Sequence, residues 1–162
     1  MFFSKNKKKP DDKLVMAFGT FDYLHAGHEN FLKQARSKGD YLLIVLARDN
    51  TVQSVKGRAP LNDEKTRLNN LRQTKWADQV ILGNYENKHK VILDHRPTII
   101  ALGYDQFVFT QTLQKTLIEN QLNTEIIRLD AYFPQVYRSS LLKPKTLTNQ
   151  NEKVPQTEAQ YL

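Results

Sequence analysis

Residues 15–49 read VMAFGTFDYLHAGHENFLKQARSKGDYLLIVLARD, and this stretch decides the fold. Its apolar run Val15–Phe18 is typical of a buried strand, and so is the longer run Tyr41–Ala47. Between them, the apolar residues of 28–38 recur at helical spacing, and Gly39 follows as the expected C-cap. Continuous apolar strands are covered on both faces, so this order predicts a parallel strand–helix–strand unit.

The rest of the chain continues this alternation. It predicts a Rossmann-like, doubly wound α/β domain with a five-stranded parallel sheet and helices on both faces. In the helix expected over 111–121, Leu113, Leu117 and Ile118 share the face that should meet the sheet. The expected elements after residue 47 are a basic polar loop over 48–60, a helix over 62–75 capped by Asn62, a strand over 79–83, a short helix around 91–93, a strand over 98–103, the helix over 111–121, a strand over 124–129 and a short helix over 137–143.

The composition excludes several kinds of chemistry. The 162 residues include no cysteine, which rules out disulfides, thiolate metal ligands and cysteine nucleophiles. The longest apolar run, Leu42–Ala47, is far too short to span a bilayer, and the charged N-terminus does not read as a signal peptide. We therefore expect a cytoplasmic protein without a membrane partner. Its domain should span 14–143, between a flexible basic segment 1–13 and a flexible polar tail 144–162.

Of the net charge of +7, the middle of the chain carries +4, and this mild excess suits a phosphorylated substrate. Five lysines lie within the first 13 residues, where the run Lys7–Lys9 is interpreted as a solvated tail. Nucleic-acid binding usually requires a denser basic face with interleaved aromatic residues. The sequence lacks that pattern outside its termini, so we expect no nucleic-acid partner.

Two histidines, His25 and His28, follow the first expected strand where the helix begins. In doubly wound sheets, ligands bind at the carboxyl ends of strands. A helix N-terminus offers unpaired N–H groups to an anion, and Gly19 and Gly27 would let the backbone approach that anion closely. Two imidazoles in such a turn favour a phosphate site.

Three alternatives for this histidine pair stay open. The rings could belong to the core, lie on the surface, or hold a metal together with His89 or His95. The metal alternative lacks a third ligand at short spacing.

Other strand ends also carry groups that suit phosphate. Lys56 offers a point charge after the second strand, and Arg67 on the next helix offers a two-pronged fork. Gly103 permits close approach after the fourth strand, while Ser139 and Ser140 would cap the last helix and present donors to an anion. An exposed basic loop, a plain turn and ordinary helix caps are the structural alternatives.

The stretch GTFDYLHAGH resembles the H-x-G-H signature of the nucleotidyltransferase superfamily, which includes the cytidylyltransferases and phosphopantetheine adenylyltransferase. The resemblance covers about residues 14–143. Within the superfamily, the segments ARDNTVQSVKGRAPL, TRL, ADQVILG, IIALGYDQ and YRSS are most similar to archaeal-type FAD synthases, and next to glycerol-3-phosphate cytidylyltransferase. YRSS departs from the R-T-x-G-I-S-T form of cytidylyltransferases, which lowers the weight of the cytidylyl alternative.

The resemblance implies a role for each group. His25, His28 and Lys56 would be catalytic: His28 near the α-phosphate, His25 near the leaving phosphates, and Lys56 where charge builds up. Arg67 and Asp22 would bind the acceptor phosphate. The implied nucleotide-binding residues are Gly19, Thr20, Phe21, Gly27, Gly103, Asp105, Tyr137, Ser139 and Ser140.

Converging anion sites without a carboxylate pair, thiol or serine triad favour one reaction. An acceptor phosphate attacks the α-phosphorus of a nucleoside triphosphate, ATP or CTP, and pyrophosphate leaves. Mg²⁺ would travel on the triphosphate, because no protein metal site is evident. Dimers are common in the superfamily, which makes a homodimer an open alternative.

FMN with ATP is the favoured pair of substrates, giving FAD. The alternative is CTP with glycerol 3-phosphate or a related alcohol phosphate, and a further alternative is a catalytically silent nucleotide-binding protein. A flavin would require an aromatic slot, for which the candidates are Phe107, Phe109, Tyr132, Phe133 and Tyr137.

Overall fold

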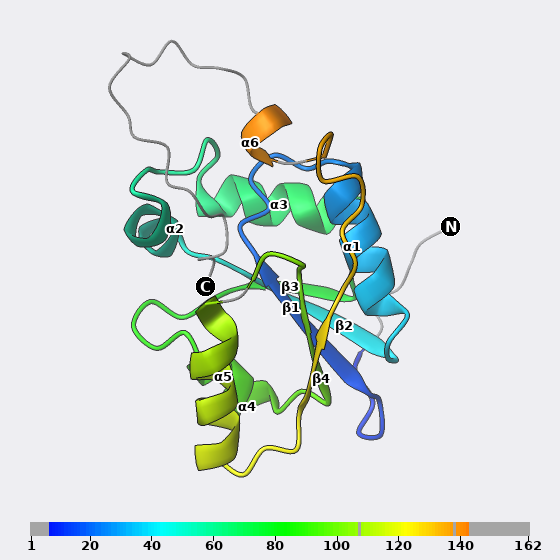
Figure 1. Ribbon diagram of the computed structural model, residues 1–162. Coiled ribbons are helices and arrows are strands. Elements are labelled where there is room, and N and C mark those ends of the chain that lie inside the picture. The colour runs from blue at the N-terminus through cyan, green and yellow to red at the C-terminus, as the bar shows by residue number, and fades with distance from the viewer. Residues whose placement is uncertain (1–6, 107, 138, 143–162) are drawn as a thin grey trace.

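The computed structural model describes residues 7–106, 108–137 and 139–142, which form five strands and six helices (Figure 1). In chain order these are β1 (Leu14–Gly19), α1 (Ala26–Arg36), β2 (Tyr41–Leu46), α2 (Asp49–Lys56), α3 (Glu64–Thr74), β3 (Gln79–Leu82), α4 (Lys90–His95), β4 (Ile99–Leu102), α5 (Val108–Glu119), β5 (Glu125–Arg128) and α6 (Ser139–Leu142).

The strands form one parallel sheet in the order β3-β2-β1-β4-β5. β1 lies at its centre and pairs with β2 along its whole length, and with β4 over residues 15–17. The chain moves outward through β2 and β3 and then returns to place β4 on the other side of β1. This reversal leaves a crevice at the carboxyl ends of β1 and β4, where doubly wound sheets bind ligands. The predicted fold class is confirmed.

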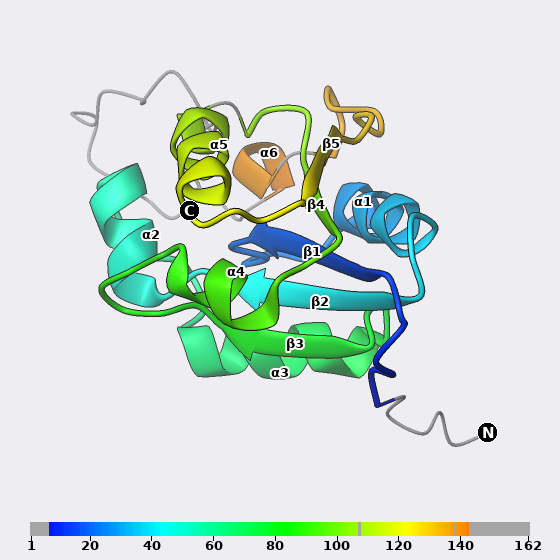
Figure 2. The same ribbon diagram turned by 90° about the horizontal axis from the view of Figure 1, so that it is seen from below.

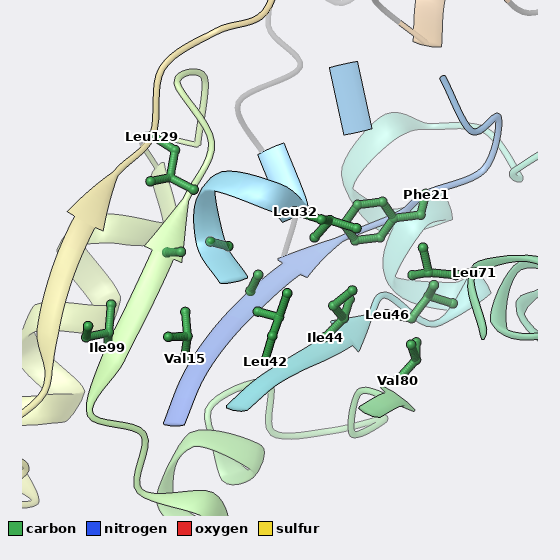
Figure 3. Packing of buried hydrophobic residues seen from close by; sticks show 13 residues of the cluster. Val15, Phe21, Leu32, Leu42, Ile44, Leu46, Leu71, Val80, Ile99 and Leu129 are labelled. Carbon is green, nitrogen blue, oxygen red and sulfur yellow. The ribbon is translucent and has the colours of Figure 1, made fainter. Parts of the chain in front are cut away.

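Helices cover both faces of the sheet, which explains the continuous apolar runs of its central strands (Figures 1 and 2). On one face, Val91 of α4 and Leu113 of α5 belong to a buried cluster with β1, β2 and β4. On the other face, Leu32 of α1 and Leu71 of α3 join a second cluster, in which Ile44 is one of the strand residues (Figure 3).

The prediction of a loop over 48–60 was wrong in part, because residues 49–56 form α2. Val52 is the only buried residue of this helix, so its apolar periodicity is too weak to recognise in the sequence. The Asp49 N–H donates to the Glu64 carboxylate at 2.9 Å, and Gly57 ends the helix in the left-handed conformation at φ 70°. α2 is therefore stabilised by the carboxylate of Glu64, which is distant in the sequence, and by the Gly57 cap, rather than by an apolar face.

The predicted cap of α3 also differs. Asp63, not Asn62, is the N-cap, and its carboxylate accepts from the Thr66 N–H at 2.7 Å. Asn62 is unavailable for capping because its side-chain amide donates to the Asp22 carbonyl at 2.9 Å.

Two residues of other helices differ from their predicted roles. The C-cap of α1 is Ser37, whereas Gly39 lies where a Cβ atom would come within 2.6 Å of the Lys13 carbonyl oxygen. Ile118 of α5 is 78% exposed, although the other two predicted core residues of that helix are buried. Gly39 is therefore required because the backbone of Lys13 packs closely against it. Ile118 continues the apolar sequence pattern of α5 but does not lie on the face that packs against the sheet.

Two hydrogen bonds precede the first strand, and the predicted domain boundaries stay a prediction. The Lys9 N–H donates to the Asp12 carboxylate at 2.7 Å, and the Lys13 N–H donates to Asp40 at 2.9 Å. Residues 1–6 and the predicted tail over 144–162 lie outside the described part of the chain. Within the described part, no helix combines the length and apolar character needed to cross a membrane.

Candidate active site

A cavity opens at the reversal point of the sheet, where the segments following β1, β4 and β5 meet the C-terminal end of α2. The three predicted catalytic side chains, His25, His28 and Lys56, all line it. The other predicted site residues in its wall are Gly19, Thr20, Phe21, Asp22, Gly27, Gly103, Asp105 and Tyr137. The fold therefore brings together residues that are more than a hundred positions apart in the sequence.

The turn after β1 is held in an unusual conformation. Phe21 has a positive φ of 50°, which costs an aromatic residue about 1 kcal/mol or more. Its ring is buried and packs on Gly19, where a Cβ atom would lie 2.6 Å from the ring. Thr20 is also buried, and its hydroxyl has no hydrogen-bond partner among the residues described. The turn thus places a buried hydroxyl in the wall of the cavity.

His25 and His28 stack on each other at the N-terminus of α1. Their ring centroids are 3.9 Å apart at an interplanar angle of 25°. His25 is the N-cap, and its Nδ1 accepts from the Gly27 N–H at 3.1 Å. Because Nδ1 accepts, the proton of the neutral ring is on Nε2, which remains a donor. A Cβ on Gly27 would come within 2.9 Å of the His25 ring, so glycine is required there.

The histidines of the metal alternative do not join this pair. His89 bonds through Nδ1 to the Thr116 hydroxyl at 2.9 Å, and His95 bonds through Nδ1 to the Val91 carbonyl at 2.9 Å. Burial and then the neighbouring Lys88 charge lower the pKa of His89. No group of three histidine, cysteine or acidic residues able to hold a metal occurs in the described ranges.

Asp22 and Arg67 are buried in the scaffold, and neither fits the predicted contact with an acceptor phosphate. Asp22 lines the cavity, but its carboxylate accepts from the Leu61 and Asn62 N–H groups at 2.8 and 2.9 Å. Its negative charge would also repel a phosphate. Asp22 instead fastens the segment after α2 to the turn after β1.

Arg67 is 0% exposed and does not contribute to the cavity wall. Its guanidinium donates to the Thr20 and Ala47 carbonyls at 2.8 Å each, and to the Asp49 carboxylate at 2.6 Å. A third carbonyl, that of Asn62, accepts from Nε at 3.0 Å. This arginine therefore ties together the ends of β1 and β2 and the starts of α2 and α3.

Gln106, the last residue of the segment IIALGYDQ, was not among the predicted site residues, yet it spans the crevice. Its side-chain amide donates to the Phe18 carbonyl at 3.2 Å and accepts from the Gly103 N–H at 2.6 Å. Arg128 supports the same segment from β5, donating to the Gly103 carbonyl at 2.6 Å. The sequence does not reveal these roles, because the Phe18 carbonyl is 88 positions from Gln106 and the Gly103 carbonyl is 25 positions from Arg128.

Aromatic rings extend from the histidine pair toward the outer rim of the cavity. His25 and Tyr137 are nearly parallel, with centroids 6.4 Å apart at 17°, and Tyr137 stacks on Tyr132 at 5.6 Å and 16°. Tyr132 is 38% exposed, and its ring lies edge-on to that of Phe133, with the ring centroids 4.8 Å apart. These residues form the ring column, defined as His28, His25, Tyr137 and Tyr132.

Some predicted site residues are not described. Ser139 and Ser140 begin α6, as expected for a helix start, but their side chains lie outside the described part of the structure, as does that of Phe109. Phe107 lies outside it entirely. Their predicted roles stay predictions.

The fold and the cavity define an α/β protein with two imidazoles and one ammonium group where such sheets bind nucleotides. The chain belongs to the cytidylyltransferase-like family, whose model matches residues 16–147. It is therefore a nucleotidyltransferase. The predicted superfamily membership is confirmed.

The chain is similar to archaeal proteins named FAD synthase. The protein from Thermoplasma volcanium is 37% identical over 133 residues, which cover 82% of this chain and 93% of the relative. The protein from Thermococcus sibiricus is 38% identical over 130 residues, covering 80% and 85%.

Solved structures share the fold. A Thermoplasma volcanium protein described as a lipopolysaccharide core biosynthesis protein matches with a TM-score of 0.70 at 37% identity, covering 75% of this chain and 98% of that chain. Pantoate-β-alanine ligase from Francisella tularensis matches with a TM-score of 0.54 at 15% identity, covering 77% and 61%. At that identity the likeness concerns the fold alone.

Proposed function

We propose that this nucleotidyltransferase is an FAD synthase, which transfers AMP from ATP to FMN and releases pyrophosphate. The observation that carries the proposal is the ring column, which joins an exposed aromatic surface to two imidazoles within one cavity. The similarity to FAD synthases over four fifths of the chain supports the same choice of substrates.

The chemistry requires positioning and charge stabilisation more than proton transfer. The FMN phosphate is ionised at neutral pH, so it attacks the α-phosphorus without a strong base. One of its oxygens bonds to that phosphorus while the bond to the bridging oxygen of the β-phosphate breaks, and the electron pair leaves with pyrophosphate. In this proposal His28 donates to the α-phosphate oxygens, and His25 Nε2 and Lys56 stabilise the charge on the leaving group.

The ring column distinguishes FMN from a small alcohol phosphate. FMN carries a planar three-ring system joined to its phosphate by a five-carbon chain, so it can stack on Tyr132 while the phosphate reaches toward His28. Stacking of aromatic rings adds about 0.5–1.5 kcal/mol beyond their burial. Glycerol 3-phosphate has no ring and would leave this surface unused.

Mg²⁺ would accompany ATP rather than occupy a protein cage. It prefers oxygen ligands in octahedral geometry, and the described residues contain no group of three acidic or histidine side chains that could hold it. When bound, the ion would neutralise part of the triphosphate charge. The side chains named above would then orient the phosphates around it.

Pyrophosphate release tests the proposal directly. ATP and CTP are each combined with FMN, glycerol 3-phosphate, phosphocholine and phosphopantetheine. Release with ATP and FMN alone is the expected result. Release with CTP and a small alcohol phosphate would favour the cytidylyltransferase alternative over the proposed FAD synthase. Absence of release from every pair would favour a catalytically silent nucleotide-binding protein.

The role of the ring column is tested by Tyr132→Leu. Loss of stacking is expected to raise the KM for FMN about two- to tenfold, while the KM for ATP changes less than about twofold. Tyr23→Leu is the matched control, because Tyr23 is similarly exposed at 41% and lies outside the cavity wall. Equal shifts in both KM values would argue against flavin stacking on Tyr132.

A further inference from the structure

The N-termini of α2 and α3 cap each other through two carboxylates. The Asp49 N–H donates to the Glu64 carboxylate at 2.9 Å, and the Glu64 N–H donates to the Asp49 carboxylate at 3.0 Å. Arg48 donates to Glu64 at 2.8 Å and lies 4.1 Å from the centre of the Tyr85 ring. Each carboxylate also complements the positive end of a helix dipole. We call these four residues the α2–α3 junction.

Two arginines also hold the N-terminal end of α2: Arg67 donates to the Asp49 carboxylate at 2.6 Å, and Arg48 Nε donates to the Gly83 carbonyl at 2.7 Å. Val52 is the single buried residue of α2, and residues 57–59, which follow this helix, are exposed. The next anchor is the bonding of Leu61 and Asn62 to the Asp22 carboxylate. The direction of the helix axis therefore depends on contacts at its N-terminal end, to which the α2–α3 junction contributes two hydrogen bonds and an ion pair.

Lys56 lies at the opposite end of α2 and lines the cavity. At 1.5 Å per residue, its Cα lies about 10 Å along the axis from that of Asp49. A tilt of about 10° at the junction would therefore move Lys56 by about 2 Å. Misplacing a catalytic group by about 1 Å can lower the rate by a factor of about 100. A small change at the junction can therefore have a large effect on the rate through the position of Lys56.

We propose that Glu64 is a positioning residue that aims Lys56 into the cavity by capping α2. The inference rests on the proposed function, because it takes Lys56 to meet the reacting phosphates. Burial raises the pKa of Glu64, but its hydrogen-bond donors lower it by more, so the net pKa lies below the ordinary value. Glu64 is therefore charged at neutral pH, as its contact with Arg48 requires.

A double-mutant cycle between Glu64→Ala and Lys56→Ala tests this inference, with turnover of ATP and FMN as the readout. Glu64→Ala alone is expected to lower kcat by about ten- to a hundredfold. In the Lys56→Ala background, the same change is expected to alter kcat less than about twofold, because both act through one side chain. Glu64→Gln keeps an oxygen acceptor for the Asp49 N–H and is expected to restore most of the rate.

Asp78 provides a matched control. Its carboxylate also accepts from a backbone N–H, that of Leu42 at 2.8 Å, and pairs with an arginine, Arg36 at 3.1 Å. It lies at the amino ends of the strands, opposite the cavity. Asp78→Ala is expected to lower the melting temperature about as much as Glu64→Ala does while leaving kcat unchanged.

Hydrogen exchange gives a readout that does not depend on activity. The amides of residues 52–56 are expected to exchange at least about tenfold faster in Glu64→Ala, and unchanged exchange would overturn the inference. Losses of kcat that multiply in the double variant would also overturn it. A wild-type protein that turns over no substrate pair would instead refute the proposed function, and exchange would still decide whether Glu64 fixes α2.

Discussion

At the scale of single residues, the site depends on positions with little freedom to vary. Gly27 is confined between the His25 ring and the Tyr137 carbonyl, at 2.9 and 3.1 Å from where its Cβ would be. Nδ1 of His25 accepts the hydrogen bond that caps α1, and Nε2 is a donor. The H-x-G-H spacing is thus explained by packing as well as by chemistry.

Replacing His28 with alanine should lower turnover of ATP and FMN by about 10²–10³-fold, because one donor to a transition-state oxygen is lost. The melting temperature should change by no more than a few degrees, since the side chain lies at the cavity surface. Steady-state pyrophosphate release and thermal unfolding measure the two effects. His95→Ala is the control, and near-normal turnover in His28→Ala would remove this residue from the mechanism.

The positions of site residues were predictable where they depend on local sequence, whereas the roles of these residues stay predictions. The histidine turn was found from its spacing, and the structure brings His25, His28 and Lys56 to one cavity. Arg67 was misinterpreted because sequence does not reveal that its guanidinium is fully buried. Gln106 was given no role because its contact with the Phe18 carbonyl joins residues 88 positions apart.

At the scale of elements, the helices differ in how far each is stabilised by residues of its own sequence. α1 shows apolar periodicity and a capping residue in its own sequence, so it was predicted with small errors at its ends. α2 buries a single residue and is stabilised by Glu64, fifteen positions later, so it was predicted as a loop. Long-range polar contacts of this kind leave no periodic signal.

The α2–α3 junction should make stability sensitive to acid. The pKa of Glu64 is lower in the folded protein than its unfolded value of about 4.3, so the folded state binds this proton less readily. Its contribution is complete above the unfolded pKa and is lost as pH falls through the folded pKa. Urea unfolding between pH 7 and pH 3 should therefore show wild type and Glu64→Gln converging in free energy of unfolding at low pH.

The difference between wild type and Glu64→Gln isolates the charge of Glu64. Other carboxylates titrate in both proteins and cancel in the difference between them. A difference in free energy of unfolding that stays constant from pH 7 to pH 3 would show that the charge of Glu64 contributes nothing.

At the scale of the whole molecule, one reversal of the sheet brings the site together. Segments after three strands and one helix meet at this point, and Arg67 fastens four of the chain segments beneath it. The alternation of apolar runs was sufficient to predict the sheet and both helical layers. The scaffold beneath the cavity was not predictable, because its polar contacts include pairs of residues 15 to 88 positions apart.

Arg67→Met should destabilise the protein by about 3 kcal/mol or more, because buried carbonyl groups and the Asp49 carboxylate lose their donor. Urea unfolding measures this loss. Arg72→Met is the control, because Arg72 is exposed and bonds to a single carbonyl, that of Val80. A stable Arg67→Met variant with weakened FMN binding would instead restore the predicted phosphate contact.

The amide of Gln106 has a mechanical consequence for the whole domain. β1 and β4 pair only as far as Ala17 and Ala101, and beyond that point the Gln106 side chain acts as an extra rung between the two strand ends. The two halves of the sheet are therefore cross-braced at the cavity wall. We expect the ends of β1 and β4 to keep their separation when a nucleotide binds.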